Sequence, residues 1–127
     1  MTIALWCVLA AFILPYAFTG YAKFLGGFGP KQNHNPREFL ETLTGERKRA
    51  HWAQLNSFEV NPAFAAAVII AQQVGTAAQG DIDKIAIAFI VSRVLFGLCY
   101  IKDWASLRTL VWSAGMAFIV GLFVISA

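Results

Sequence analysis

The chain has 127 residues, of which 58% are hydrophobic and 13% charged, and its formal net charge is +3. Its mean hydropathy of +0.61 lies outside the range of ordinary soluble domains, and its length allows one domain. A basic excess in a soluble protein would suggest nucleic acid, but here the basic residues lie beside apolar runs, where they have a topological meaning. We therefore expect a single membrane domain over residues 1–127, with the lipid bilayer and not nucleic acid as its partner.

Four apolar runs are long enough to cross a bilayer as helices, which takes about 20 mainly apolar residues. They cover about residues 3–24, 53–74, 85–101 and 107–125. The first run is not preceded by Lys or Arg, so it lacks the charged start of a signal peptide and is expected to be retained. The predicted fold class is therefore all-α and integral to the membrane, a subunit built as a bundle of four transmembrane helices.

A polar loop of about residues 26–49 separates the first two runs. Its basic side chains are Lys31, Arg37, Arg47, Lys48 and Arg49. Asn and Pro residues at 33–37 predict a turn, and the helical spacing of residues 38–43 predicts a short interfacial helix that stops at Gly45.

Basic residues are distributed unevenly among the loops. Lys102 and Arg108 flank the last connection, whereas the connection before it holds Asp81, Asp83 and only Lys84. Loops rich in Lys and Arg stay in the cytoplasm. We expect a multi-pass protein of a bacterial inner membrane, with the long first loop in the cytoplasm and both termini outside it.

Several polar side chains fall inside the apolar runs, where an ionisable group costs at least about 2.5 kcal/mol on insertion scales and so needs a partner, water or a function. Asn56 and Glu59 are three residues apart and share a helix face, as do Arg93 and Tyr100, which are seven apart. In antiparallel helices Glu59 and Arg93 lie at matching depths, which predicts an ion pair.

Two interpretations of this polar cluster remain open. Glu59 and Arg93 could simply neutralise each other, with Asn56 bridging helices by hydrogen bonds. Alternatively they could form, with Arg108 and Lys102, a cationic pocket for an acidic polar ligand, since the guanidinium fork matches carboxylates in two-point contacts.

Cysteine and proline add little to the functional interpretation. Cys7 and Cys99 lie in apolar runs without metal-ligand spacing, which predicts buried thiols and no metal site. Pro15 and Pro62 are tolerated as kinks in membrane helices, so they do not argue against the predicted spans.

The segment at 49–62, Arg-Ala-His-Trp-Ala-Gln-Leu-Asn-Ser-Phe-Glu-Val-Asn-Pro, resembles the MAPEG family, the membrane-associated proteins of eicosanoid and glutathione metabolism. The matching positions are Asn56, Glu59 and Pro62 in the second run, Arg93 and Tyr100 in the third, and Arg108 at the start of the fourth. The order and spacing of these positions match together over most of the chain.

The resemblance implies a homotrimer of four-helix subunits that binds glutathione between neighbouring subunits near the cytoplasmic side. The residues that the resemblance assigns to glutathione are Asn56, Glu59, Arg93, Tyr100 and Arg49. Arg108 is expected to be catalytic, because it would face the thiol and favour the thiolate. The implied activity is that of a membrane-bound glutathione transferase or peroxidase, with glutathione as substrate and a lipophilic small molecule as the electrophile.

Three positions depart from the glutathione-using members. Trp52 stands where they have Arg, Val60 where they have Tyr, and Phe96 where a His or a second aromatic hydroxyl is common. The alternative is therefore a non-enzymatic membrane trimer that binds lipid or another amphiphile in the inter-subunit cleft. A small multidrug transporter fits less well, because the first run has no acid and Glu59 has Arg93 as its expected counter-ion.

Overall fold

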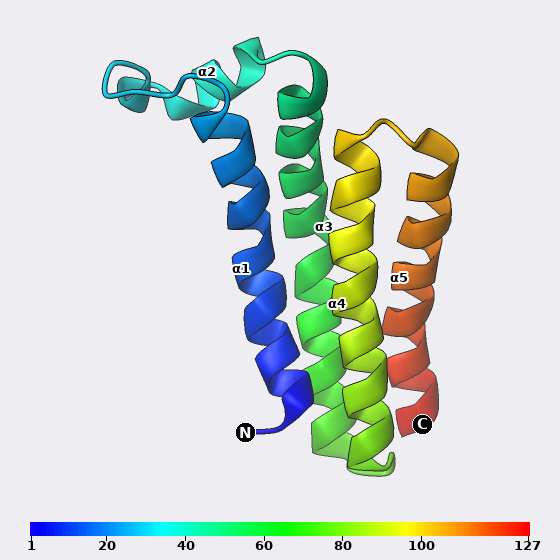
Figure 1. Ribbon diagram of the computed structural model, residues 1–127. Helices are drawn as coiled ribbons and strands as arrows, with labels where there is room; N and C mark the ends of the chain where they lie inside the picture. The colour runs from blue at the N-terminus through cyan, green and yellow to red at the C-terminus, as the bar shows by residue number, and fades with distance from the viewer.

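The computed structural model describes residues 1–127 as five α-helices and one short 3₁₀ helix. The elements are α1 (Ile3–Phe24), η1 (Gln32–His34), α2 (Pro36–Thr42), α3 (Gly45–Val74), α4 (Gln79–Ile101) and α5 (Ala105–Ser126). Figure 1 shows α1, α3, α4 and α5 side by side in one bundle, with the chain termini at one end. The segment that contains η1 and α2 projects sideways from the other end.

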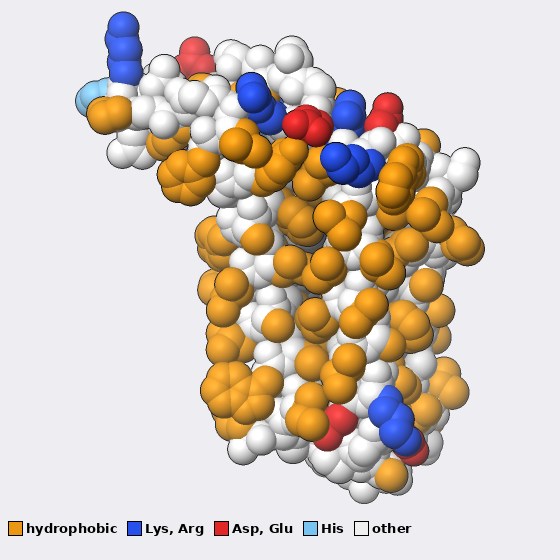
Figure 2. Space-filling model, in the orientation of Figure 1, with side chains coloured by type: hydrophobic (Ala, Val, Ile, Leu, Met, Phe, Trp, Pro, Cys, Tyr) orange, Lys and Arg blue, Asp and Glu red, His pale blue; other side chains and the backbone are white.

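Three of the long helices, α1, α4 and α5, are long and apolar enough to cross a membrane, so the chain is an integral membrane protein. The helix α3 is not among them. Its first half carries the charged run 46–49 and Glu59, which lower its hydropathy. In Figure 2 hydrophobic side chains cover the wall of the bundle, and most charged side chains lie near its two ends.

The helix boundaries match the apolar runs at some ends and not at others. The helix α1 covers the predicted run, but α3 begins at Gly45 and α4 at Gln79, ahead of the predicted starts near 53 and 85. An apolar run marks the part of a helix that suits lipid, whereas the backbone helix continues into polar sequence. The short helix expected in the first loop is present as α2, but Gly45 does not end it, because α2 ends at Thr42 and Gly45 begins α3.

The bundle core is made largely of alanine and phenylalanine. The rings of Phe64 on α3 and Phe89 on α4 stack with centroids 3.9 Å apart, and both are fully buried. On the α1–α4 side, Phe18 lies directly against Gly97, so a side chain at position 97 would overlap the Phe18 ring. Pro15 and Pro62 lie within α1 and α3, and both helices continue past them, as expected for membrane helices.

The short helix α2 is fastened to the start of α3 by charged groups. Lys48 Nζ donates to the carbonyl oxygen of Glu41 at 2.8 Å and to its carboxylate at 2.7 Å. The buried His51 ring lies on the other carboxylate oxygen at 3.3 Å. The hydrogen bond from Lys48, and secondarily the one from His51, lowers the pKa of the Glu41 carboxyl. The projecting segment is thus held at its C-terminal end by the ionised form of Glu41.

Candidate functional site

The polar cluster predicted from sequence is built around a sealed arginine. Arg93 on α4 is 1% exposed and points at α3, where its guanidinium donates to Asn56 Oδ1 at 2.9 Å and to Ser57 Oγ at 3.2 Å. The guanidinium carbon also lies over the Phe96 ring, 4.3 Å from its centroid. Arg93 Nε has no hydrogen-bond partner. Arg93 therefore faces the inside of the subunit.

The direct Glu59–Arg93 ion pair expected from the sequence is not formed. Glu59 is exposed on the surface of α3, and its carboxylate accepts a hydrogen bond from Asn56 Nδ2 at 3.3 Å. Asn56 thus stands between the acid and the base, since its oxygen faces Arg93 and its nitrogen faces Glu59. The two charges lie at matching depth, as counted from the sequence, but their helix faces are turned so that the amide bridges them.

Arg108 lies where the first turn of α5 faces α4. Its guanidinium carbon is 4.3 Å from the centre of the Tyr100 ring, and the side chain is half-buried. Together with Asn56 the two residues line a hollow that is open to the outside, completed by Phe96, Thr109 and Trp112. The structure therefore brings together one residue from each of α3, α4 and α5, and Asn56 is distant in the sequence from the other two.

A second hollow lies next to the first and shares Asn56 and Tyr100 with it. Its other walls are Trp52, Leu55 and Glu59, and the Trp52 and Tyr100 rings lie 6.4 Å apart. One hollow thus contains a cation and the other an anion, with Tyr100 and Asn56 between them. A ligand that covers both would meet Arg108 at one end and Glu59 at the other.

Two other predicted cations do not line these hollows. Arg49 Nε donates to the carbonyl oxygen of Ile101 at 3.0 Å, which ties the first turns of α3 to the last turn of α4. Lys102 is exposed on the connection between α4 and α5. Within one subunit, Arg108 is therefore the basic side chain that the hollows offer.

A comparison of the chain with known protein families matches residues 3–127 to the MAPEG family. The chain belongs to the MAPEG family. No curated protein and no solved structure matches it. The match covers essentially the whole chain, so in this MAPEG member the hollows of Arg108 and Glu59 belong to the family's own domain and not to an added one.

Sequence reasoning missed three contributors to the site. Ser57 receives a hydrogen bond from Arg93, and its hydroxyl donates in turn to the Ala53 carbonyl at 2.8 Å. Thr109 and Trp112 form the α5 wall of the first hollow. The sequence contains one signal for Ser57, namely its position directly after Asn56. The α5 wall depends on the rotation of α5 about its axis, which residue spacing does not fix.

Proposed function

We propose that this MAPEG chain is a membrane-bound glutathione transferase or peroxidase-like protein that acts on lipophilic electrophiles. The observation that carries the proposal is Arg108 over the Tyr100 ring, at the edge of a hollow that it shares with Asn56. A cation beside a thiol favours the thiolate, and the thiolate is the nucleophile that forms the new bond to carbon. Arg108 is the proposed catalytic residue.

Asn56 and Glu59 are proposed to bind the peptide part of glutathione. Glu59 is exposed in the second hollow, where its carboxylate can pair with an ammonium group. Asn56 can offer its amide to the peptide backbone of the ligand. Arg93 is sealed behind Asn56, so we assign it the role of holding the Asn56 amide in one orientation. Tyr100 forms the shared wall of both hollows, and Arg49 would act from the rim.

The assembly proposed with this function is a homotrimer in which α3 provides the fourth membrane crossing. Both hollows are open on the outer wall of the subunit, so a neighbouring copy could close them and supply further polar groups. Four crossings agree with the positions of the termini at one end of the bundle. With the basic loops in the cytoplasm of a bacterial cell, both termini lie outside it and the hollows face the cytoplasmic side.

The proposal is tested by adding glutathione and a lipophilic electrophile such as chlorodinitrobenzene to the protein in mild detergent, and by following both conjugation and calorimetric binding. The proposal predicts saturable glutathione binding that is lost in Asn56→Leu and retained in Lys84→Ala, which lies at the opposite end of the bundle. Binding unaffected by Asn56→Leu would place glutathione elsewhere, and no binding at all would overturn the proposal.

A second candidate is a non-enzymatic trimer that holds lipid or another amphiphile in the inter-subunit cleft. The observation in its favour is the small number of basic side chains in the hollows. Glutathione has two carboxylates, whereas the hollows of one subunit contain only one basic side chain, that of Arg108. Trp52 stands at the wall where a further cation would be useful. This candidate predicts a folded trimer with no affinity for glutathione.

A further inference from the structure

The second hollow contains an acid that has no basic partner within the subunit. Glu59 lies in the apolar part of α3, where an ionised side chain needs a partner or water. Its carboxylate accepts one hydrogen bond, from Asn56 Nδ2, and it takes part in none of the three ion pairs of the chain. A carboxylate can accept about four hydrogen bonds, so most of this capacity is free for a ligand.

The other walls of the second hollow also favour a positive charge. Trp52 and Tyr100 supply aromatic rings, whose centroids lie 6.4 Å apart. The face of an aromatic ring carries partial negative charge, so it attracts a cation and disfavours an anion. Leu55 completes the wall without a polar group. An ammonium group in this hollow would therefore meet one carboxylate and two rings.

Two basic side chains close to this hollow are occupied elsewhere. Lys48 Nζ lies 6.0 Å from the centre of the Trp52 ring, but it donates to the Glu41 carboxylate and to two carbonyl oxygens of α2. An ammonium group has three N–H donors, and these three contacts use them all. Arg93 is sealed inside the subunit. A ligand carboxylate in the second hollow would thus lie close to Glu59 without a basic partner.

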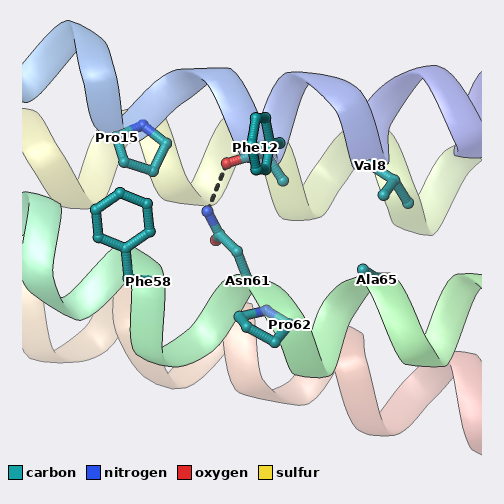
Figure 3. A pocket seen from close by; sticks show the side chains of 8 residues that line it. Val8, Phe12, Pro15, Phe58, Asn61, Pro62 and Ala65 are labelled. Carbon is teal, nitrogen blue, oxygen red and sulfur yellow. Dashed lines mark hydrogen bonds between the residues drawn. The ribbon is translucent and has the colours of Figure 1, made fainter.

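The charge of this stretch of α3 is confined to the second hollow. Where α3 meets α1, Phe58, Asn61 and Pro62 line an apolar groove together with residues of α1, as Figure 3 shows. No charged side chain lines that groove. A charged amine is therefore expected to bind in the second hollow and not in the groove.

We propose that the second hollow binds an ammonium group that has no carboxylate beside it, so that the thiol substrate is an aminothiol of this kind and Trp52 determines the specificity. The inference rests on the proposed function, because it names the class of thiol for the same site. The ammonium pairs with Glu59 while the thiolate lies beside Arg108, which uses the one anion and the one cation of the hollows. Glutathione has a carboxylate on the same carbon as its amine, and this carboxylate would lack a basic partner.

Glutathione and the peptide 4-aminobutanoyl-cysteinyl-glycine test the proposal, because they differ only in the carboxylate beside the amine. Binding of each to the full-length protein in nanodiscs is measured by calorimetry, and conjugation to chlorodinitrobenzene is followed in parallel. We expect this decarboxylated peptide to bind about tenfold more tightly than glutathione, as one charged interaction allows. Glutaryl-cysteinyl-glycine, which keeps the carboxylate and lacks the amine, should bind most weakly of the three.

Two substitutions at Trp52 separate charge from shape. Trp52→Phe keeps an aromatic wall and should keep the preference for the decarboxylated peptide, whereas Trp52→Arg adds a cation and should reverse the preference in favour of glutathione. Glu59→Gln should weaken binding of the decarboxylated peptide about tenfold, because the ammonium loses its counter-ion. Phe58→Leu, which alters the apolar groove instead, is the control and should change neither result.

The outcomes distinguish the inference from the proposed function. Glutathione binding as tightly as the decarboxylated peptide, or more tightly, would overturn the inference and leave the proposed function standing. In that case a cation would reach the hollow from the rim, as Arg49 could, or from a neighbouring subunit. A preference that Trp52→Arg leaves unchanged would also overturn the inference, since the amine would then bind elsewhere. If none of the three peptides binds, the proposed function fails together with the inference.

Discussion

Asn56 is the residue on which the polar cluster depends, because one amide satisfies a buried cation and an exposed anion at once. Its oxygen can accept from Arg93 only while its nitrogen faces Glu59, so the two contacts fix one amide orientation. Removing either partner of a hydrogen-bonded buried charge leaves the other with an unrecovered desolvation cost.

A double-mutant cycle distinguishes this arrangement from a direct ion pair. Asn56→Leu and Arg93→Met should show a coupling energy of about 0.5–3 kcal/mol in the free energy of unfolding, because the two side chains are in contact. Glu59→Gln and Arg93→Met should be closer to additive, since Glu59 and Arg93 do not touch. Thermal or denaturant unfolding in detergent measures both cycles. A larger coupling energy between Glu59 and Arg93 than between Asn56 and Arg93 would show that Asn56 does not bridge the two charges.

The attachment of α2 to α3 should depend on pH through Glu41. Since the folded protein lowers the pKa of this carboxyl below its ordinary value of 4.5, the attachment is strongest above that value and is lost as the pH falls through the lowered pKa. An NMR titration of the Glu41 carboxyl should give a pKa that moves back toward 4.5 in Lys48→Ala. The Lys84→Ala variant, with its change at the far end of the bundle, should leave it unchanged. An equal pKa of Glu41 in the unaltered protein and in Lys48→Ala would show that the charged attachment does not form.

The approach of α1 to α4 rests on the absence of a side chain at one position. A Cβ at Gly97 would overlap the ring of Phe18, which is buried and has little freedom to move aside. Gly97→Ala should therefore destabilise the bundle by about 1–3 kcal/mol, the usual cost of overpacking. Gly80→Ala is the matched control in the same helix, because nothing lies within 4 Å of the added atom. Equal stability of the two variants would mean that α1 and α4 are not in close contact.

At the scale of the whole molecule, the exposed small residues and open hollows of the subunit predict self-association. Ala63 and Ala66 on α3 and Ala117 on α5 are exposed and allow close approach of another helix. Mass measurement in mild detergent should give three copies of the 13.9 kDa chain. A folded monomer would contradict the proposed assembly and would leave both hollows open.

The helices of this molecule are easier to predict from the sequence than the geometry of its site is. The apolar run of about residues 3–24 predicts α1 with the bounds that the structure has. The start of α3 is missed, since the charged run 46–49 stays helical outside the apolar part. Residue counting places Glu59 and Arg93 at one depth, but it does not fix the rotation of each helix, and this rotation inserts Asn56 between them.

The hydrogen bond from Asn61 to the Ala11 carbonyl shows the same limit from another side. Pro15 indicates a free carbonyl at Ala11, but the sequence does not say which side chain of another helix will reach it. Only the packing of α1 on α3 places Asn61 there. Patterns within one helix are thus readable from the sequence, whereas contacts between helices need their relative rotation and height.

The central claim is that Arg108 favours the thiolate of bound glutathione, and the ultraviolet absorbance of the thiolate tests it most directly. Titrating glutathione into the assembled protein should produce saturable thiolate absorbance that Arg108→Ala abolishes, because the cation over Tyr100 is lost. The Lys102→Ala variant should keep the thiolate signal. It also loses a cation near this end of the bundle, but Lys102 is exposed and lies outside the hollows. Undiminished thiolate absorbance in a correctly assembled Arg108→Ala protein would contradict the account.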